Sequence, residues 1–258
     1  MGSKKSIALI TGASSGIGLE FAKPLDSDPR IDEIWLCARR ENRLQNLAQS
    51  LNKSTKIIAG DVTDSQWQDR LQQELEQNNV QIHTLINSAG MGKKGTVEEI
   101  GRDNNAYMID LNCRALTVVC SICIPYMSTG GRILNLASVA AFLPQPKFAV
   151  YAATKSYVLS YSRALHKELK SKQITVTAVC PNPMETEFFQ HTGKPQEISS
   201  IKRIGLEQVE KVAAQALRRS ERKKDISLLS ISAKFVRIVS RILPHPFILW
   251  IEEKIGLI

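Results

Sequence analysis

The chain has 258 residues, of which 43% are hydrophobic, and a formal net charge of +9 at pH 7. This length and apolar content suit one globular domain with a full core. No run of about 18 apolar residues occurs, so we expect no transmembrane helix. The apolar run at residues 7–10 is too short for a secretory signal. The net positive charge suits nucleic acid, a membrane surface or an anionic ligand. Basic residues are scattered and form no nucleic-acid module, so a solvated basic face and an anionic cofactor explain most of the charge.

The five cysteines are an odd number, and their spacings do not suggest a disulfide framework. They are typical of reduced, buried residues in a cytoplasmic protein. Cys120 and Cys123 have the spacing of a metal or redox pair. They lie in an apolar helical pattern with no second Cys/His pair nearby, so core packing is the favoured interpretation. We therefore expect no metal site.

The first predicted strand, residues 7–10, enters the glycine-rich segment Thr11-Gly12-Ala13-Ser14-Ser15-Gly16-Ile17-Gly18, and a helical pattern follows. Glycine allows a backbone to approach a pyrophosphate, and a helix N-terminus supplies N–H donors and the positive end of a dipole. The order strand, turn, helix therefore predicts a dinucleotide phosphate site, with a plain turn as the alternative. Pro24 falls inside this helix and should end or kink it.

The second predicted strand, residues 33–38, ends at Arg39 and Arg40. Dinucleotide-binding folds select their cofactor here, because an acidic residue binds the ribose hydroxyls of NAD whereas arginine suits the 2′-phosphate of NADP. No Asp or Glu lies between residues 35 and 40. The sequence therefore favours NADP(H), and a solvated arginine pair that opens the next helix is the alternative.

The rest of the chain alternates strands with helices. Strands are predicted at residues 56–60, 83–86, 132–136, 174–179 and 225–229, and helices at 64–78, 103–127 and 151–170. This alternation predicts one doubly wound, Rossmann-type α/β domain with a seven-stranded parallel sheet and helices on both faces. We expect the domain to span residues 1–230, followed by a helical extension at 231–258. Ligands bind beyond the carboxyl ends of such strands.

Tyr151 and Lys155 are four residues apart, so a helix places both side chains on one face. A phenol titrates at about pH 10, and an ammonium one turn away favours the phenolate and lowers that pKa. The pair then forms a general acid/base, with Ser138 placed to hold a carbonyl oxygen. The alternative for the pair alone is a surface tyrosine beside its helical neighbour.

Together these motifs resemble the classical short-chain dehydrogenase/reductase family. The resemblance covers roughly residues 5–190 and rests on residues 11–18, Asp61-Val62, Asn87-Ser88-Ala89-Gly90, Asn112, Ser138, Tyr151, Lys155 and residues 181–186. It implies an NADP(H)-dependent oxidoreductase that interconverts a ketone and a secondary alcohol. A dinucleotide-binding sensor without catalysis is a remote alternative.

The resemblance also implies roles for individual residues. Tyr151 would donate the proton, Lys155 would lower its pKa and bind the nicotinamide ribose, and Ser138 would position the substrate oxygen. Asn112 would hold a water in the proton relay. The implied cofactor-binding residues are Gly12, Ser14, Ser15, Gly16, Ile17, Gly18, Arg39, Arg40, Asp61, Val62, Asn87, Ala89, Tyr151, Lys155 and Thr186.

Two positions depart from the family pattern. Ser88 stands where the family usually has asparagine, which is a mild change. Asn182 replaces the usual glycine after Pro181. Asparagine tolerates a positive φ better than most residues, so we expect the turn to survive.

The residues expected around the substrate are apolar. They are Met91, Phe142, Phe148, Met184 and Phe188. This set favours a bulky apolar substrate such as a hydroxysteroid or ketosteroid. A 3-oxoacyl (fatty acyl) reductase or a broad carbonyl reductase is the alternative.

The C-terminal segment differs most from the generic family and resembles that of hydroxysteroid and 3-ketoacyl reductases. Residues 232–243 predict an amphipathic helix. Its apolar stripe consists of Phe235, Ile238, Val239 and Ile242, and its basic stripe of Lys234, Arg237 and Arg241. A second apolar segment follows at residues 247–251. We expect packing over the pocket mouth or against a partner subunit, and weak contact with a membrane surface is the alternative. The resemblance implies a homodimer or homotetramer through the helices that contain Asn112 and Tyr151.

Overall fold

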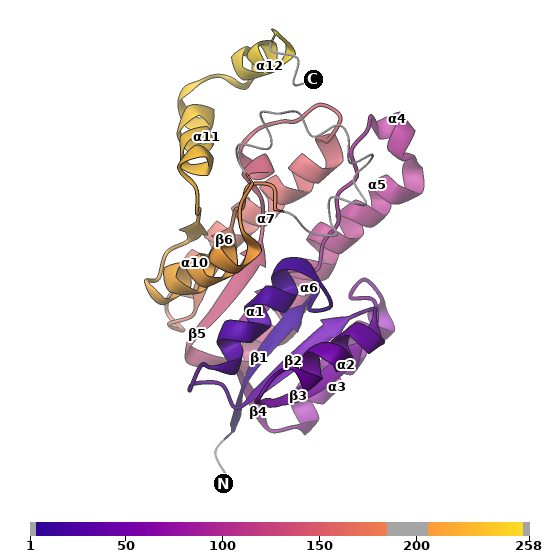
Figure 1. Cartoon of the computed structure of the whole chain (residues 1–258), viewed down its shortest axis with the longest axis vertical. Coiled ribbons are helices and arrows are strands. Elements are labelled where there is room, and N and C mark those ends of the chain that lie inside the picture. The colour runs from indigo at the N-terminus through magenta and orange to yellow at the C-terminus, as the bar shows by residue number, and fades with distance from the viewer. Residues whose placement is uncertain (1–3, 185–205, 255–258) are drawn as a thin grey trace.

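The computed structural model describes residues 4–184 and 206–254, except for the side chains of residues 251 and 252. Its centre is one parallel sheet of seven strands in the order β3-β2-β1-β4-β5-β6-β7 (Figure 1). The strands are β1 (Lys5–Thr11), β2 (Glu33–Ala38), β3 (Ser54–Ala59), β4 (Val80–Asn87), β5 (Met127–Leu136), β6 (Thr175–Val179) and β7 (Ile226–Ser227). The predicted doubly wound α/β fold is therefore confirmed.

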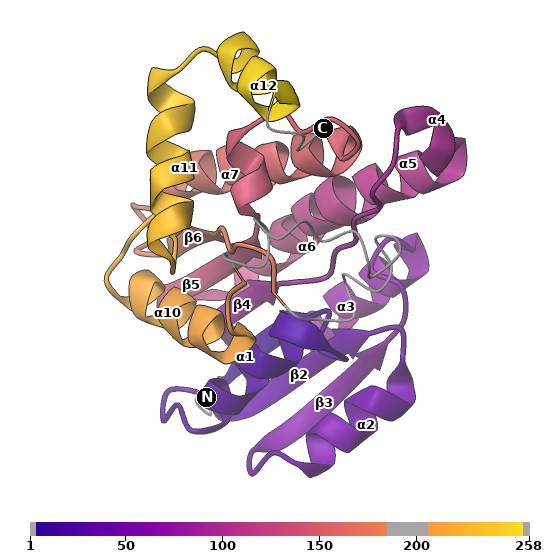
Figure 2. The same ribbon diagram turned by 45° about the horizontal axis from the view of Figure 1, so that its top comes forward.

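Helices cover both faces of the sheet. One layer contains α1 (Gly16–Asp26), α2 (Glu41–Gln49) and α10 (Val209–Glu221), and the other contains α3 (Ser65–Gln77), α6 (Leu116–Cys123) and α7 (Ala149–Glu168). Figures 1 and 2 show α1 beside α10 on one face. Because successive side chains of a strand point to opposite faces, Leu9 packs in one core and Ile10 in the other. Burial on both faces explains why these strands are nearly continuous apolar runs.

The order of the strands reverses at β1. The chain runs outward from β1 through β2 to β3, and then returns to β4 on the other side of β1. The connections after β1 and β4 therefore diverge, which opens a crevice at the carboxyl ends of these two strands. Thr11 and Asn87, the last residues of β1 and β4, pair in register at this point. The glycine-rich turn and residues 88–91 follow these two strand ends and border the crevice.

A π-helical turn interrupts the long helix that the sequence predicts at residues 103–127. The segment consists of α5 (Arg102–Ile109), the π-turn η1 (Asp110–Ala115), α6 and the 3₁₀ turn η2 (Ile124–Tyr126), after which β5 begins at Met127. Asn112 lies in the π-turn, a feature that often marks functional sites. In the described part of the chain, Arg102–Tyr126 is the one helix long and apolar enough to cross a membrane, but half of its most apolar window is buried in the fold. It therefore has the character of a core helix.

An ion-pair cluster around the buried Arg132 lies away from the carboxyl ends of the strands. Pro24 lies in the last turn of α1, and the helix ends at Asp26, close to where the proline predicts. The following loop carries Asp28, which accepts a hydrogen bond of 2.9 Å from the buried Arg132 of β5. Arg132 also donates to Glu221 of α10 at 3.0 Å. Burial raises the pKa of Asp28, but hydrogen bonds and charge from Arg30 outweigh it and lower the pKa to about 2.

Two helices follow the sheet, as expected for a C-terminal helical extension. They are α11 (Ile231–Ile242) and α12 (His245–Lys254). The Ser230 side chain caps α11 by accepting a hydrogen bond of 3.2 Å from the Ala233 amide. The helix packs against the 3₁₀ turn η3 (Val139–Phe142), which follows β5. Within the described residues, neither α11 nor α12 lines the large cavity at the carboxyl edge, so they do not cover its mouth.

Candidate active site

A cavity of about 740 Å³ opens at the carboxyl edge of the sheet, a size typical of sites for small molecules and cofactors. It brings together most of the predicted site residues. These are Gly12, Ser14, Ser15, Gly16, Ile17, Gly18, Arg39, Arg40, Asp61, Val62, Ala89, Met91, Ser138, Phe148, Tyr151, Lys155 and Met184. Thr186 and Phe188 lie outside the described residues.

Three predicted residues do not line this cavity. Phe142 is partly buried and packs against the core, and its place in the substrate pocket stays a prediction. Asn112 is buried one layer behind the cavity wall. Asn87 is buried at the end of β4, where its amide donates to Asn135 at 2.9 Å. This hydrogen bond joins the ends of β4 and β5, and a role of Asn87 in cofactor binding stays a prediction.

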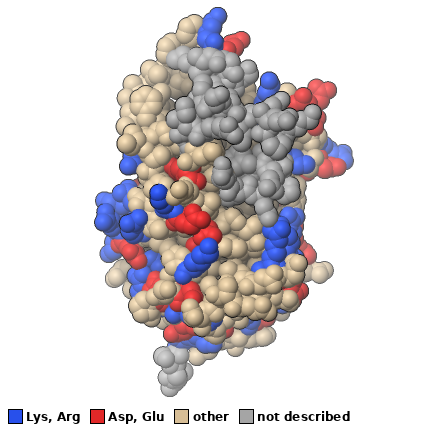
Figure 3. All heavy atoms as spheres, viewed as in Figure 1, with Lys and Arg blue, Asp and Glu red and all other residues tan. Residues whose placement is uncertain are grey.

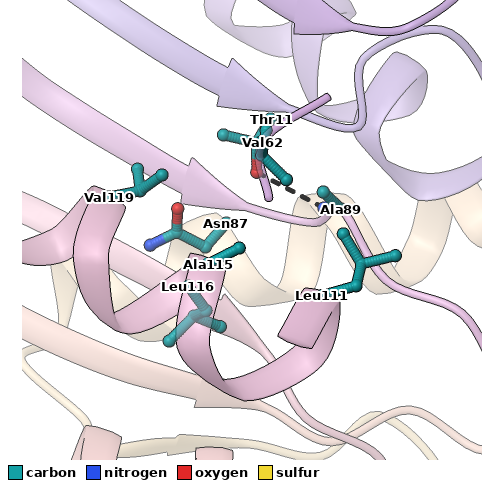
Figure 4. Close-up of a pocket in the computed structure, with 8 residues that line it drawn as sticks. All are labelled: Thr11, Val62, Asn87, Ala89, Leu111, Ala115, Leu116 and Val119. Carbon is teal, nitrogen blue, oxygen red and sulfur yellow. Dashed lines mark hydrogen bonds between the residues drawn. The ribbon is translucent and has the colours of Figure 1, made fainter. Parts of the chain in front are cut away.

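A second cavity lies beneath the first and is far too small for a cofactor (Figure 4). Its volume is about 10 Å³, close to the minimum that a single water needs. Thr11 and Asn87 supply its polar lining, and the rest is apolar. The dashed line in Figure 4 joins the Ala89 amide to the Thr11 hydroxyl, a hydrogen bond of 3.3 Å. This contact fixes the end of β4 against the end of β1.

The glycine-rich turn is held tightly against the loop after β4. Gly12 has a φ of 71°, and a Cβ atom there would lie 2.7 Å from the Ala89 amide nitrogen. A Cβ atom at Gly18 would collide with the Gly12 carbonyl and the Ser88 hydroxyl. The Ser88 hydroxyl donates a hydrogen bond to the Thr11 carbonyl, so serine at this departure from the family pattern still joins the two strand ends.

The N-terminus of α1 faces the cavity at this turn. Its N-cap residue, Ser15, makes no side-chain capping hydrogen bond, and Gly16, the first residue of the helix, lines the cavity. The N–H groups and dipole of the first turn therefore remain directed at the space where a diphosphate would bind. Turn, helix end and cavity volume all fit a dinucleotide.

Arginine side chains gather at the end of the cavity beside β2. Arg40 donates to the Ser15 hydroxyl at 2.8 Å and to the Ser14 hydroxyl at 3.2 Å. Arg39 donates to the Tyr107 hydroxyl at 3.2 Å, and its guanidinium lies 3.8 Å from Asp61. Both arginines therefore border the cavity at the position that the sequence predicts.

Tyr107 was not predicted from the sequence. Its hydroxyl donates to Asp61 at 2.7 Å. Burial and this carboxylate raise the pKa of Tyr107 to about 12. Burial also raises the pKa of Asp61, but hydrogen bonds from Thr63 and Tyr107 outweigh it and lower the pKa. The two residues are 46 positions apart, and no local pattern connects them.

The proposed acid/base group lies where β5, η3 and α7 meet. Ser138 follows β5, and Tyr151 and Lys155 lie one turn apart on α7 with both side chains buried. Ser138 makes a side-chain hydrogen bond to Tyr151. The Lys155 ammonium donates to the Leu136 carbonyl at 2.7 Å and lies 5.6 Å from the centre of the Tyr151 ring. Ser138, Tyr151 and Lys155 therefore line the same wall of the cavity.

The expected lowering of the tyrosine pKa is wrong for this geometry. Burial raises the pKa of Tyr151 to about 12, and the hydrogen bond from Ser138 offsets only part of that rise. Burial lowers the pKa of Lys155 to about 8, against a smaller raising effect of Cys113 and Cys180. The helical spacing is correct, but desolvation dominates because the ammonium is directed at the Leu136 carbonyl.

Asn112 anchors the wall behind the acid/base group. Its side-chain oxygen accepts a hydrogen bond from the Met91 amide at 2.9 Å, and its nitrogen donates to the Met91 carbonyl at 2.8 Å and to the Thr154 hydroxyl at 3.0 Å. A Cβ atom at Gly90 would lie 3.1 Å from this oxygen and 3.4 Å from the Lys155 nitrogen. The π-turn therefore holds the loop after β4 against α7.

Asn182 keeps the turn after β6 by a different means from the one expected. It is absent from the described residues with positive φ, so its backbone does not use the glycine-like conformation. Its side chain instead donates to the Ser230 and Ser232 hydroxyls, each at 2.8 Å. The buried Glu207 carboxylate accepts a hydrogen bond of 3.1 Å from the backbone N–H of Asn182. These contacts join the cavity wall to the start of α11.

The comparisons agree with this geometry. Residues 6–197 match the family model described as short chain dehydrogenase. The chain belongs to this family. It is 34% identical over 191 residues to an uncharacterized oxidoreductase of Staphylococcus epidermidis, a match that covers 73% of this chain and 82% of the relative. As a family member, the protein is an oxidoreductase that acts on CH–OH or C=O groups and binds a nicotinamide dinucleotide.

Solved structures resemble almost the whole chain. A short-chain dehydrogenase from Sphingobium yanoikuyae in complex with NADPH matches with a TM-score of 0.78 and 27% identity, over 92% of this chain and 93% of that one. The bulky-bulky ketone specific alcohol dehydrogenase from Comamonas testosteroni matches with a TM-score of 0.73 and 26% identity, over 91% of each chain.

The raised pKa of Tyr151 is open to direct measurement. Because burial holds this pKa at about 12, the cofactor-free protein should show no Tyr151 ionisation at neutral pH. A tyrosinate difference spectrum between the wild-type protein and Tyr151→Phe, recorded across pH, isolates its titration step. A step near neutral pH, present only in the wild-type protein, would show that the Lys155 charge prevails over burial.

Proposed function

We propose that the protein is an NADP(H)-dependent reductase and dehydrogenase that interconverts a bulky apolar ketone and its secondary alcohol. The observation that carries the proposal is the meeting of Ser138, Tyr151 and Lys155 on the wall of the cavity that the glycine-rich turn also borders. This arrangement places a proton donor, an oxygen-orienting hydroxyl and a cation beside a dinucleotide site. The buried ammonium and phenol have no comparable role in a sensor without catalysis.

The chain's own residues handle the oxygen and its proton. A ketone oxygen placed between Ser138 and Tyr151 accepts hydrogen bonds from both hydroxyls, which orients and polarises the carbonyl. The bound dinucleotide supplies or accepts the hydride. As the carbonyl is reduced, Tyr151 passes its hydroxyl proton to the developing alkoxide, and the alcohol forms. Lys155 then stabilises the phenolate until a proton from solvent restores the phenol.

The cofactor preference is supported by charge at the end of the cavity beside β2. Arg39 and Arg40 both line the cavity there, and Arg40 already contacts the two serines of the glycine-rich turn. Asp61, the acidic residue nearby, has one oxygen engaged by Thr63 and the other by Tyr107. Its carboxylate is therefore used to position Tyr107, whereas the arginines suit a 2′-phosphate.

The substrate class is supported by the apolar wall next to Tyr151. Phe148 packs against the Tyr151 ring with a centroid distance of 4.3 Å, and Met91, Val139 and Met184 also line the cavity. A bulky ketone such as a steroid fits this lining, and the Comamonas testosteroni structure with 26% identity is specific for bulky ketones. A 3-oxoacyl substrate is the second candidate.

We further propose a cytoplasmic location, consistent with five free thiols.

Removal of the proton donor tests the chemistry. Tyr151→Phe keeps the ring but loses the hydroxyl, so the rate of ketone-dependent NADPH oxidation should fall by about 10²-fold or more. Tyr157→Phe is the matched control, because Tyr157 lies on the same helix and is exposed. It should keep the wild-type rate. Comparable rates for wild type and Tyr151→Phe would exclude this residue as the acid.

Reversal of the charge at Arg39 tests the cofactor preference. Arg39→Asp should weaken NADPH binding by about tenfold or more, because it removes a charge-assisted contact with the 2′-phosphate, and should leave NADH binding unchanged or stronger. Arg102→Asp makes the same charge change at a side chain that is 93% exposed and outside the cavity. Fluorescence titration of both cofactors measures the affinities. Equal affinity of the wild-type protein for NADPH and NADH would contradict the preference.

A further inference from the structure

The helix α11 presents its most apolar stripe to the outside. Ile231, Phe235, Ile238 and Ile242 are 83%, 65%, 56% and 73% exposed. Their spacing places all four on one face of the helix. Ala233, on the opposite face, is buried, and the helix packs against η3. An amphipathic helix on the surface of a globular domain normally turns its apolar face to the core. The stripe of α11 faces outward, so it is suited to an apolar surface outside the described chain.

The next helix extends the exposed apolar surface. Ile248 of α12 is buried, whereas Phe247 and Trp250 are exposed. The two aromatic rings stack with their centroids 5.9 Å apart. Aromatic side chains of this kind are enriched where a protein meets the headgroup level of a bilayer.

The charges beside the stripe are positive. Lys234 and Arg241 are exposed on α11, and this helix contains no acidic residue. Arg222, Lys223 and Lys224 are also exposed, directly after α10. Figure 3 shows basic side chains gathered over α10, below the largely uncharged surface of α11. An apolar stripe flanked by cations is complementary to an anionic lipid surface.

The same charges disfavour a second copy of the chain as the occupant. A symmetric contact through the stripe would place the same cationic helix on both sides of the interface. Like charges of α11 would then face one another, because this helix contains no acidic residue, and the exposed Glu253 lies at the far end of α12 beside Lys254. A spanning helix is also excluded for this element, because α11 has 12 residues and a bilayer requires about 20.

We propose that α11 and α12 form a docking face for the surface of an anionic bilayer. The stripe enters the interface between headgroups and acyl chains, and Lys234 and Arg241 lie at the headgroups. Asn182 links this face to the catalytic cavity, because the residue lines the cavity and its side chain donates to Ser230 and Ser232 at the start of α11. Docking therefore places the cavity close to the lipid. The proposal does not depend on the proposed reaction.

Flotation of the full-length protein with vesicles tests the docking face. The protein should float with vesicles of equal parts phosphatidylcholine and phosphatidylglycerol, less with pure phosphatidylcholine, and less as salt rises. The double substitution Phe235→Ser/Ile238→Ser should lower the partition coefficient more than about tenfold. Lys234→Glu/Arg241→Glu should abolish the preference for the anionic vesicles. Val97→Ser, at an equally exposed apolar residue of α4 (Val97–Ile100), should float like wild type.

Two results would overturn the proposal. One is a wild-type protein that stays with the soluble fraction in the presence of the anionic vesicles, or a Phe235→Ser/Ile238→Ser protein that floats equally well. The other is a change of assembly state caused by Phe235→Ser/Ile238→Ser in sedimentation without lipid, which would assign the stripe to a second copy of the chain. Thermal melting confirms that each variant is folded, and these exposed positions leave the core intact.

Discussion

The buried ammonium of Lys155 is the constraint around which the site is arranged. Its hydrogen bond of 2.7 Å to the Leu136 carbonyl attaches α7 to the end of β5, and this attachment places Tyr151 beside Ser138. Burial of a cation is costly, and its effect is the lowering of the Lys155 pKa to about 8. At pH 7 the charged form still prevails by roughly tenfold. The site therefore keeps its cation at neutral pH.

Close backbone contacts at three glycines place the dinucleotide site next to Lys155. Gly12 and Gly18 allow the turn before α1 to lie against Ala89 and Ser88, and Gly90 leaves room for Asn112 beside Lys155. Each contact joins the end of one strand to the loop after another. The glycine-rich turn and the acid/base group consequently line one continuous cavity, although their residues come from distant parts of the chain.

Much of this arrangement follows from local sequence patterns. Alternating apolar strands and helices predict the sheet, and parallel strands bring the residues after them to one edge. The helical spacing of Tyr151 and Lys155 also predicts their shared face. Local patterns contain nothing about the partners that tertiary structure supplies, such as Tyr107 for Asp61, or Ser230 for Asn182. The sequence predicts a lowered pKa for Tyr151, whereas burial raises it. Local patterns miss this effect because burial is a property of the whole fold.

Hydride transfer from the dinucleotide to a ketone is the reaction for which this site is arranged. The most direct test is a reaction of the wild-type protein with NADPH that carries deuterium at the transferred position of the nicotinamide ring. We expect an alcohol product with deuterium on its carbinol carbon, as measured by mass spectrometry and NMR. Two results would exclude hydride transfer at this site. One is an alcohol that carries no deuterium, whichever face of the nicotinamide ring is labelled. The other is the absence of reduction across a panel of bulky ketones and 3-oxoacyl substrates.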